Sequence, residues 1–407
     1  MRGIFTVAVG VPVLATVVAQ SMVTFSGLSV PVLAPAAAET IGLDARNVGA
    51  FTAIVYFIAS VTSPMTGSVL TRFGGLRLTQ FALVMSGLGI ALFAIGHPLV
   101  ALVAALAIGC GVGPVTPASS HILARQTPPP LQPLAFSIKQ TGVPLGGALA
   151  GLLVPPLVLT FGWQGAAIAV GACSLICAVA IEPLRGWLDA ERRTEGPRTP
   201  IRVMGPLRLI FADPALRRLA IASFVFSGTQ LSISAFLVVF FTEALGLGLT
   251  AAGIAYAVAQ GGGVVGRIVW GALAEQVFRS RTLVIALGLA TAVSLAILSQ
   301  ATGAWPFWLL ASISTLLGAT AIGWTGLYLA EVARLAPPGR AGEATGGAMF
   351  MTFGGVVVGP PLVTIIVATT GSYGAAFLTL GGFTMLAAVW LAAGGERRTM
   401  RQPGGHP

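Results

Sequence analysis

Two cationic side chains, Lys139 and Arg267, are the residues whose positions point most directly to chemistry in this sequence. Each lies inside a long apolar run, about six residues from an end that leads to a basic loop. At about 1.5 Å per helical residue, both are expected roughly 9 Å in from the same membrane face. A charge at the bilayer centre costs roughly 2.5–3.5 kcal/mol even on the lenient insertion scale. Two cations without an acid partner therefore require water or an anionic guest.

Two alternatives stay open for this pair. Both side chains could extend to the inner headgroups, because long cationic side chains bury their stems and keep their charges wet. Arg267 could instead pair with Glu275, which lies further along the same apolar run.

Polar and aromatic residues elsewhere in the apolar runs are further candidates for lining a substrate cavity. The pair Trp324 and Tyr328 is four residues apart and so shares one helix face. Ordinary helix packing is the competing interpretation for the aromatic residues. The remaining candidates are Gln140, Gln230, Gln260 and Tyr56.

Composition predicts the elements that position these residues. The chain has 407 residues, of which 56% are hydrophobic and 8% charged, and its mean hydropathy is +0.92. A soluble domain carries about 25% charged residues, so lipid must cover the excess apolar surface. The runs are longer than the roughly ten residues of a barrel strand and lack its alternation. We therefore expect an all-α membrane protein.

Apolar runs long enough to span a membrane number about twelve, since each crossing needs roughly 20 residues. Lysine and arginine gather in alternate loops, which predicts that both termini are cytoplasmic. The net charge of +10 follows from these loops, so no nucleic-acid partner is expected, and we predict a multi-pass protein of a bacterial inner membrane. The expected spans are 5–33, 47–70, 77–96, 98–124, 134–160, 163–182, 218–242, 250–273, 281–300, 305–332, 342–370 and 373–394.

One long polar segment divides these spans six and six. We expect an N-terminal six-helix bundle at 1–184, a cytoplasmic linker at 185–217 and a C-terminal six-helix bundle with a short tail at 218–407. Short matches recur about 205 residues apart, such as Pro155-Pro156-Leu157 with Pro360-Pro361-Leu362. The two bundles are therefore expected to be pseudo-symmetric repeats, as in many carriers.

Residues for enzyme or metal chemistry are scattered. The three cysteines lie inside apolar runs, and the three histidines are far apart in the sequence. Catalysis and zinc binding both need clustered groups. We expect no catalytic residue, no metal, no cofactor and no enzyme activity, in a chain that acts as a monomer in the lipid bilayer.

The loop after the second run resembles the signature of the major facilitator superfamily. That signature has Gly, three residues, Asp-Arg, one residue and Gly. Here Gly67, Arg72 and Gly74 match, while Thr71 replaces the aspartate. A second copy after the eighth run starts at Gly271 and keeps an acid, Glu275. The resemblance covers the whole chain and implies a carrier that works by alternating access, with these loop residues in gating.

The fifth run resembles the family's antiporter motif imperfectly, in Gly142-Val143-Pro144-Leu145-Gly146-Gly147. Small residues at four-residue spacing let helices approach closely in lipid, and the eighth run has such spacing around Gly266. In the family, spans 5 and 8 face each other. We therefore expect gating roles for Gly142, Pro144, Gly146, Gly147 and Gly266, although simple helix packing explains the same pattern.

Arg267 carries a second resemblance. Arg267 lies four residues before Gly271, the glycine of the eighth-span motif. This position resembles that of an arginine in monocarboxylate transporters and oxalate–formate exchangers, where the arginine meets the substrate carboxylate. The resemblance implies a secondary transporter of a small organic anion such as a carboxylate, coupled to protons or to a counter-anion. The alternatives are a proton-coupled exporter of drugs or other lipophilic compounds, and a sensor or enzyme on a carrier fold. Export of cations usually needs an embedded acid, and none is evident in the first six spans.

Overall fold

The computed structural model describes residues 7–42, 44–128, 132–190, 204–337 and 341–393, and every regular element in those ranges is helical. Backbone groups in lipid must be bonded internally, and a helix achieves this within one segment. The α-helices are α1 Val7–Ile41, α2 Val48–Phe73, α3 Gly75–Phe93, α4 Pro98–Gln126, α5 Gln132–Gln140, α6 Gly142–Ala180, α7 Arg185–Leu188, α8 Met204–Ala212, α9 Pro214–Val239, α10 Leu249–Gln276, α11 Ser280–Leu298, α12 Phe307–Leu317, α13 Thr325–Leu335, α14 Ala341–Thr370 and α15 Tyr373–Ala393. Short 3₁₀ turns lie at Ala45–Asn47 (η1) and Glu182–Leu184 (η3), and π-helical segments at Phe240–Ala244 (η4) and Gly318–Ile322 (η5).

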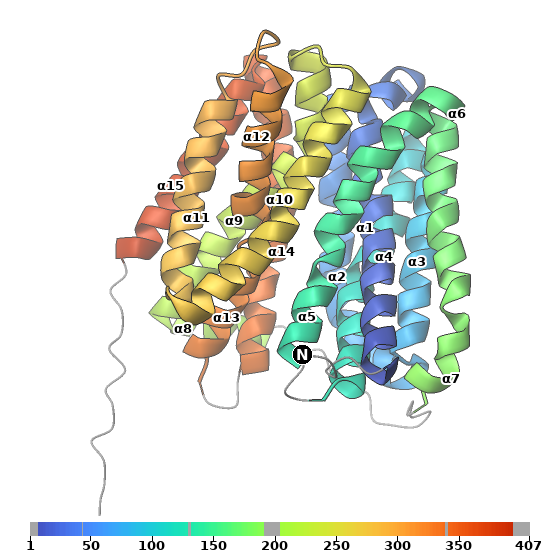
Figure 1. Ribbon diagram of the computed structural model, residues 1–407, viewed down its shortest axis with the longest axis vertical. Helices are drawn as coiled ribbons and strands as arrows, with labels where there is room; N and C mark the ends of the chain where they lie inside the picture. The colour runs from blue at the N-terminus through green and yellow to red at the C-terminus, as the bar shows by residue number, and fades with distance from the viewer. Residues whose placement is uncertain (1–6, 43, 129–131, 191–203, 338–340, 394–407) are drawn as a thin grey trace, which may run out of the picture.

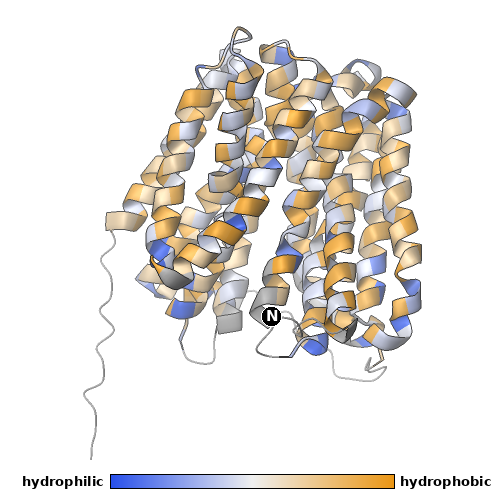
Figure 2. Ribbon diagram, in the orientation of Figure 1, coloured by the Kyte–Doolittle hydropathy of each residue, from blue (hydrophilic) through white to orange (hydrophobic). Residues whose placement is uncertain are grey.

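Within the described ranges, eleven helical stretches are long and apolar enough to span a membrane. One of them, Ile138–Leu188, has 51 residues, enough for two crossings of roughly 20 residues each. Gly162 breaks α6 there, with φ of 70° and ψ of 170°, a conformation open essentially only to glycine. The twelve crossings predicted from the sequence are therefore present. Large apolar side chains face outward along the helices: Leu159, Val179 and Trp308 expose 73%, 74% and 68% of their surface. The ribbon coloured by hydropathy is mostly apolar along the spans (Figure 2).

The helices form two groups that lie side by side (Figure 1). In the first group α1 packs on α6, α2 on α4, and α3 on both α4 and α6. In the second, α9 packs on α14, α10 on α12 and η5, and α11 on α15. When the membrane spans are numbered in chain order, span 1 packs on span 5, span 2 on span 4 and span 3 on span 6. In the second group span 7 packs on span 11, span 8 on span 10 and span 9 on span 12. The packing therefore repeats in the way expected of a duplicated chain.

The expected linker is partly helical: α7 and α8 lie within 185–217, and α8 packs against α9 and α14 of the second group. The bundle boundaries at 184 and 218 stay a prediction.

Two close contacts join the two groups near the end of the molecule that is expected to face outside. The Thr364 hydroxyl of α14 donates to the Arg46 carbonyl of η1 at 3.0 Å. Gly49 of α2 lies so close to α14 that a Cβ there would be 2.7 Å from the Pro360 carbonyl oxygen. Toward the opposite end the ribbons of the two groups diverge (Figure 1). The structure therefore has its expected outer end closed.

Orientation is the first testable prediction. Reporter fusions after Gly246, Gly303 and Gly371 should be active outside, and fusions at Gly74 and Ser280 inside, because arginine-rich loops stay in the cytoplasm. An alkaline phosphatase and green fluorescent protein pair at each site measures this. Two or more reversed sites would contradict the twelve-span orientation.

Candidate substrate site

Arg267 of α10 joins the two groups of helices through a backbone carbonyl. Its guanidinium is half-buried, and Nη1 donates to the carbonyl oxygen of Gln140 in α5 at 2.6 Å. This oxygen is available because Pro144 has no N–H, and residue 144 would otherwise donate to the carbonyl four residues earlier. The chain accordingly ends α5 at Gln140 and starts α6 at Gly142. The missing N–H of Pro144 thus leaves the Gln140 carbonyl as an acceptor for Arg267.

The second bond of Arg267 goes to a π-helical segment in span 10. Its Nε donates to the Ile322 carbonyl oxygen at 3.3 Å, and the neighbouring Trp270 donates from Nε1 to the Ala319 carbonyl oxygen at 2.7 Å. A π-helical turn inserts an extra residue and disturbs the regular bonding of the helix. Two side chains of α10 therefore hold the irregular part of span 10.

Lys139 of α5 is fully buried, with 0% of its surface exposed. Its Nζ lies 3.3 Å from the Thr116 carbonyl oxygen of α4 and 3.4 Å from Oε1 of Gln140. The ammonium thus stays inside the protein and does not extend to the headgroups.

Lys139 and Arg267 therefore converge on one residue, Gln140, the first through its side chain and the second through its backbone. Each of them donates, within the described ranges, to neutral oxygens only. The side chain of Glu275, the alternative partner for Arg267, lies outside the described part of the chain. Of the five N–H donors of a guanidinium, two bond to oxygens of the described residues. The site can attract an anion, and the described residues contain no cluster of groups that could hold a metal ion.

Gln260 lies further along the contact between spans 5 and 8. It is buried, and its amide nitrogen is 3.4 Å from the hydroxyl of Ser234 in α9. Tyr256, one turn away on the same face of α10, is also buried. Tyr256 could not be predicted from the sequence, because a tyrosine in an apolar run looks the same whether it lines a cavity or packs in the core.

Tyr56 of α2 is half-buried and lines a hollow of about 370 Å³ between α1, α2 and α4. Thr24 and Thr52 add hydroxyl groups to its otherwise apolar wall. The hollow belongs to the first group of helices and is separate from the contacts of Lys139 and Arg267.

Trp324 and Tyr328 are core residues of the second group, with 2% and 1% of their surfaces exposed. Nε1 of Trp324 donates to Oε1 of Gln230 at 3.0 Å, and its ring packs edge-on against Phe226 with centroids 5.6 Å apart. Three of the sequence candidates thus form one cluster, whose contacts are those of helix packing.

The glycines of span 5 form two stripes that face different helices. Gly142 and Gly146 lie against α1: a Cβ on Gly146 would be 2.8 Å from the Phe25 nitrogen. Gly147 lies against Gln260 of α10, and a Cβ on Gly151 would be 2.8 Å from the nitrogen of Ala257. The joint between spans 5 and 8 therefore uses the second stripe.

The remaining gating candidates have diverse surroundings. Gly266 packs within its own group, since a Cβ there would be 2.6 Å from the Ala319 carbonyl oxygen, whereas Gly271 faces open space. The nearest neighbours of Gly142, Gly146 and Gly266 all belong to their own group of helices, and the gating roles of these glycines stay a prediction. Pro144 is buried, and the surroundings of Gly67 and of the Glu275 side chain lie outside the described residues.

The loop after span 2 is held by an acid that the sequence motif did not reveal. The carboxylate of Asp189, which follows α7, accepts from the backbone nitrogens of Leu76 at 2.9 Å and Arg77 at 3.1 Å. Gly74 has φ of 89° and passes so close to this carboxylate that a side chain would collide with it. Asp189 therefore caps the free N–H groups at the start of α3.

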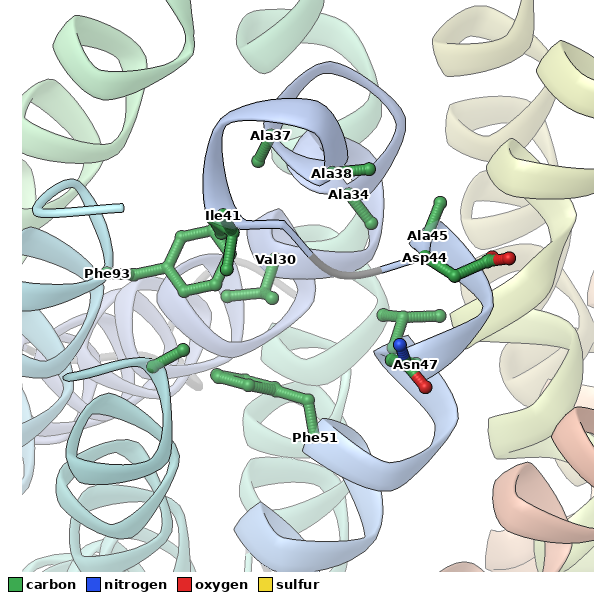
Figure 3. A pocket seen from close by; sticks show the side chains of 12 residues that line it. Val30, Ala34, Ala37, Ala38, Ile41, Asp44, Ala45, Asn47, Phe51 and Phe93 are labelled. Carbon is green, nitrogen blue, oxygen red and sulfur yellow. The ribbon is translucent and has the colours of Figure 1, made fainter. Parts of the chain in front are cut away.

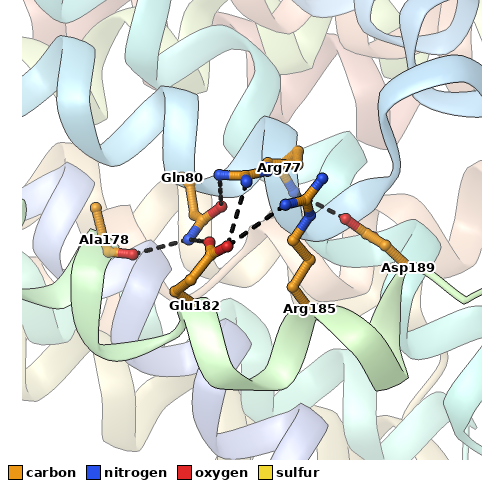
Figure 4. Close-up of polar contacts among 6 residues, drawn as sticks. All are labelled: Arg77, Gln80, Ala178, Glu182, Arg185 and Asp189. Carbon is orange, nitrogen blue, oxygen red and sulfur yellow. Dashed lines mark hydrogen bonds and ion pairs between the residues drawn. The ribbon is translucent and has the colours of Figure 1, made fainter.

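Glu182 continues this network at the end of span 6 (Figure 4). It accepts from Arg77 at 3.2 Å, from Gln80 at 2.7 Å and from Arg185 at 3.5 Å. Arg72 itself is exposed and covers the ring of its neighbour Phe73. The basic loop is thus anchored within the first group of helices.

A larger hollow, of about 400 Å³, lies near the expected outer end of α1 and α2 (Figure 3). Its wall is almost wholly apolar, with Phe51 and Phe93 on one side and alanines of α1 on the other. Asp44 at its edge is paired with Arg46 at 2.6 Å, and the hydrogen bonds and charge of Arg46 outweigh the opposing effect of partial burial and lower the pKa of this carboxyl. No uncommitted charge faces the hollow from the described residues that line it, so it is a poor place for an ionic substrate.

Comparison with known proteins agrees with this arrangement. Residues 14–356 match the sequence model of the Major Facilitator Superfamily. The chain belongs to the major facilitator superfamily. Among its relatives in this superfamily are monocarboxylate transporter 11 of Mus musculus, 28% identical over 404 residues that cover 91% of this chain and 85% of the relative, and the hexuronate transporter of Bacillus subtilis, 22% identical over 354 residues that cover 83% and 81%.

Solved structures of superfamily transporters have the same fold. A point mutant of the nucleoside transporter NupG superposes with a TM-score of 0.77 at 14% identity and covers 94% of this chain and 99% of that one. A bacterial homologue of the lysosomal transporter Spinster, inward-facing and occupied, gives 0.71 at 14% identity, with coverage of 93% and 95%. The chain is thus a multi-pass membrane transporter of the superfamily, related to the monocarboxylate carriers.

Proposed function

We propose that this protein is a secondary active transporter that moves a small organic anion, such as a carboxylate, by alternating access. The observation that carries the proposal is the convergence of Arg267 and Lys139 on Gln140, where both bond only to neutral oxygens among the residues that the structure describes. An arginine fork binds a carboxylate through two parallel hydrogen bonds. The names of two relatives, a monocarboxylate transporter and a hexuronate transporter, both denote organic acids.

The proposed setting is the inner membrane of a bacterium, with both termini in the cytoplasm and the chain acting as a monomer. Bundles at 1–184 and 218–407 rock about the bound anion, with 185–217 as their linker. Protons or a counter-anion drive the movement. Catalysis has no part in this proposal.

Transport into proteoliposomes tests the substrate class. Labelled lactate, labelled galacturonate and a labelled lipophilic cation are each offered with and without a proton gradient. We expect uptake of at least one carboxylate, competition by other carboxylates and no uptake of the cation, because the site holds two positive charges. Transport of the cation, with no competition by any carboxylate, would replace this proposal with proton-coupled export of lipophilic compounds.

A further inference from the structure

The bond between Arg267 and the Gln140 carbonyl uses one of the five N–H donors of the guanidinium. Nη1 and this oxygen are 2.6 Å apart, the shorter of the two bonds that Arg267 makes to protein oxygens. Arg267 belongs to α10 of the second group, and Gln140 to α5 of the first. The acceptor and the cation therefore come from the two parts of the molecule that move relative to each other in alternating access.

Pro144 is the cause of this acceptor. Thr141 N bonds to the Ile138 carbonyl at 3.0 Å, and Leu145 N to the Thr141 carbonyl at 3.0 Å. In a regular α-helix the N–H of residue 144 would donate to the Gln140 carbonyl oxygen, but proline has no N–H. A partly buried carbonyl without a donor is unfavourable, and Arg267 supplies a donor to this oxygen.

We propose that the Gln140 carbonyl competes with the transported anion for Arg267 and thereby promotes release of the anion when the outer end is closed. This inference rests on the proposed function and adds a release step to it. With the outer end closed by Arg46, Gly49 and Thr364, the carbonyl occupies one donor of the guanidinium and weakens its hold on a carboxylate. Pro144 is then a positioning residue, because it acts on the anion only through the carbonyl that it frees.

Pro144→Ala tests the competition. The alanine N–H can bond the Gln140 oxygen within the helix and withdraw it from Arg267. We expect the dissociation constant for the transported carboxylate, lactate or galacturonate, to fall about tenfold, since a bond to a charged group is worth about that factor or more. The maximal transport rate should fall with it, because release slows. If Pro144 has only a structural role, the dissociation constant of Pro144→Ala should stay the same or rise.

Two control variants separate the carbonyl from other causes. Gln140→Ala keeps the backbone oxygen and removes the side chain beside Lys139, so it should not tighten binding. Pro156→Ala restores an N–H at an exposed position further along the same helix, α6. It does not affect the N–H that would bond the Gln140 carbonyl, so it should leave binding unchanged. Pro144→Gly carries the same new N–H and takes the place of the alanine variant if that one is not recovered folded.

Binding of labelled lactate and galacturonate to purified protein, together with uptake into proteoliposomes, gives both parameters. Unchanged or weaker binding in folded Pro144→Ala, or equal tightening in Gln140→Ala, overturns the inference. If wild-type protein binds neither anion and Arg267→Ala transports normally, the proposed function fails instead. Binding that Arg267→Ala abolishes but Pro144→Ala does not tighten contradicts the release step alone.

Discussion

Arg267→Ala is expected to abolish carboxylate transport while leaving the protein inserted in the membrane. The substitution removes the guanidinium that would meet the carboxylate, and loss of a hydrogen bond to a charged group costs roughly 1.5–3 kcal/mol. That corresponds to about ten- to a hundredfold in affinity. Alanine keeps the helix intact, although the Gln140 and Ile322 carbonyls lose their donor. Uptake of labelled lactate and galacturonate, normalised to the amount of protein in the membrane, measures the effect.

Two further variants show whether charge or shape is responsible. Arg267→Lys keeps the positive charge but not the planar fork, so it should retain weak binding and lose most transport. Lys139→Met keeps volume and removes a buried charge. It should reduce uptake more mildly than Arg267→Ala and raise the melting temperature, because an ammonium with neutral partners is costly to bury. Wild-type uptake by Arg267→Ala would refute the anion site.

Gly151→Leu is expected to block transport by preventing closure of the outer end. The position faces the backbone of α10, where the Ala257 nitrogen would lie 2.8 Å from a Cβ. Backbone atoms cannot move aside as a flexible side chain can, and overpacking typically costs about 1–3 kcal/mol. We expect uptake to fall at least about tenfold, in line with that cost, while insertion stays normal.

Gly382→Leu is the matched control, since no atom lies within 4 Å of a Cβ there and α15 is likewise a spanning helix. Gly146→Leu tests the stripe that faces α1: it should lower the melting temperature and the amount of folded protein, because it disrupts packing inside one group. Near-normal uptake by Gly151→Leu would show that spans 5 and 8 are not a moving joint at this depth.

The fold was largely predictable because lipid imposes one simple constraint on a long apolar run. Run lengths predicted twelve crossings, and the structure has them, including the break at Gly162 that lies between two expected spans. The sequence predicted only that Lys139 and Arg267 lie at a similar depth in the membrane. Their convergence on Gln140 depends on a backbone oxygen, and every residue has a backbone oxygen, so residue types give no sign of it.

Side-chain direction is the part that sequence could not supply. Gly146 and Gly147 are neighbours, yet one faces α1 and the other α10, because successive helical residues point about 100° apart. Choosing between them needs the rotation of the helix in the bundle. Asp189 was missed for another reason: it caps α3 from more than a hundred residues away, and such a distant contact leaves no local pattern.

The π-helical segment Gly318–Ile322 has a consequence for the geometry of span 10. Each residue advances an α-helix by about 100°, and a π-helical turn adds one residue without advancing the helix in the usual way. The span therefore runs in two rotational phases, one before Gly318 and one after Ile322. The rings of Trp324 and Tyr328 belong to the second phase, and Trp324 reaches Gln230 in that phase. A single-residue deletion within this segment would remove the extra residue and bring the sequence on both sides into one helical phase, while the residues after it keep their direction.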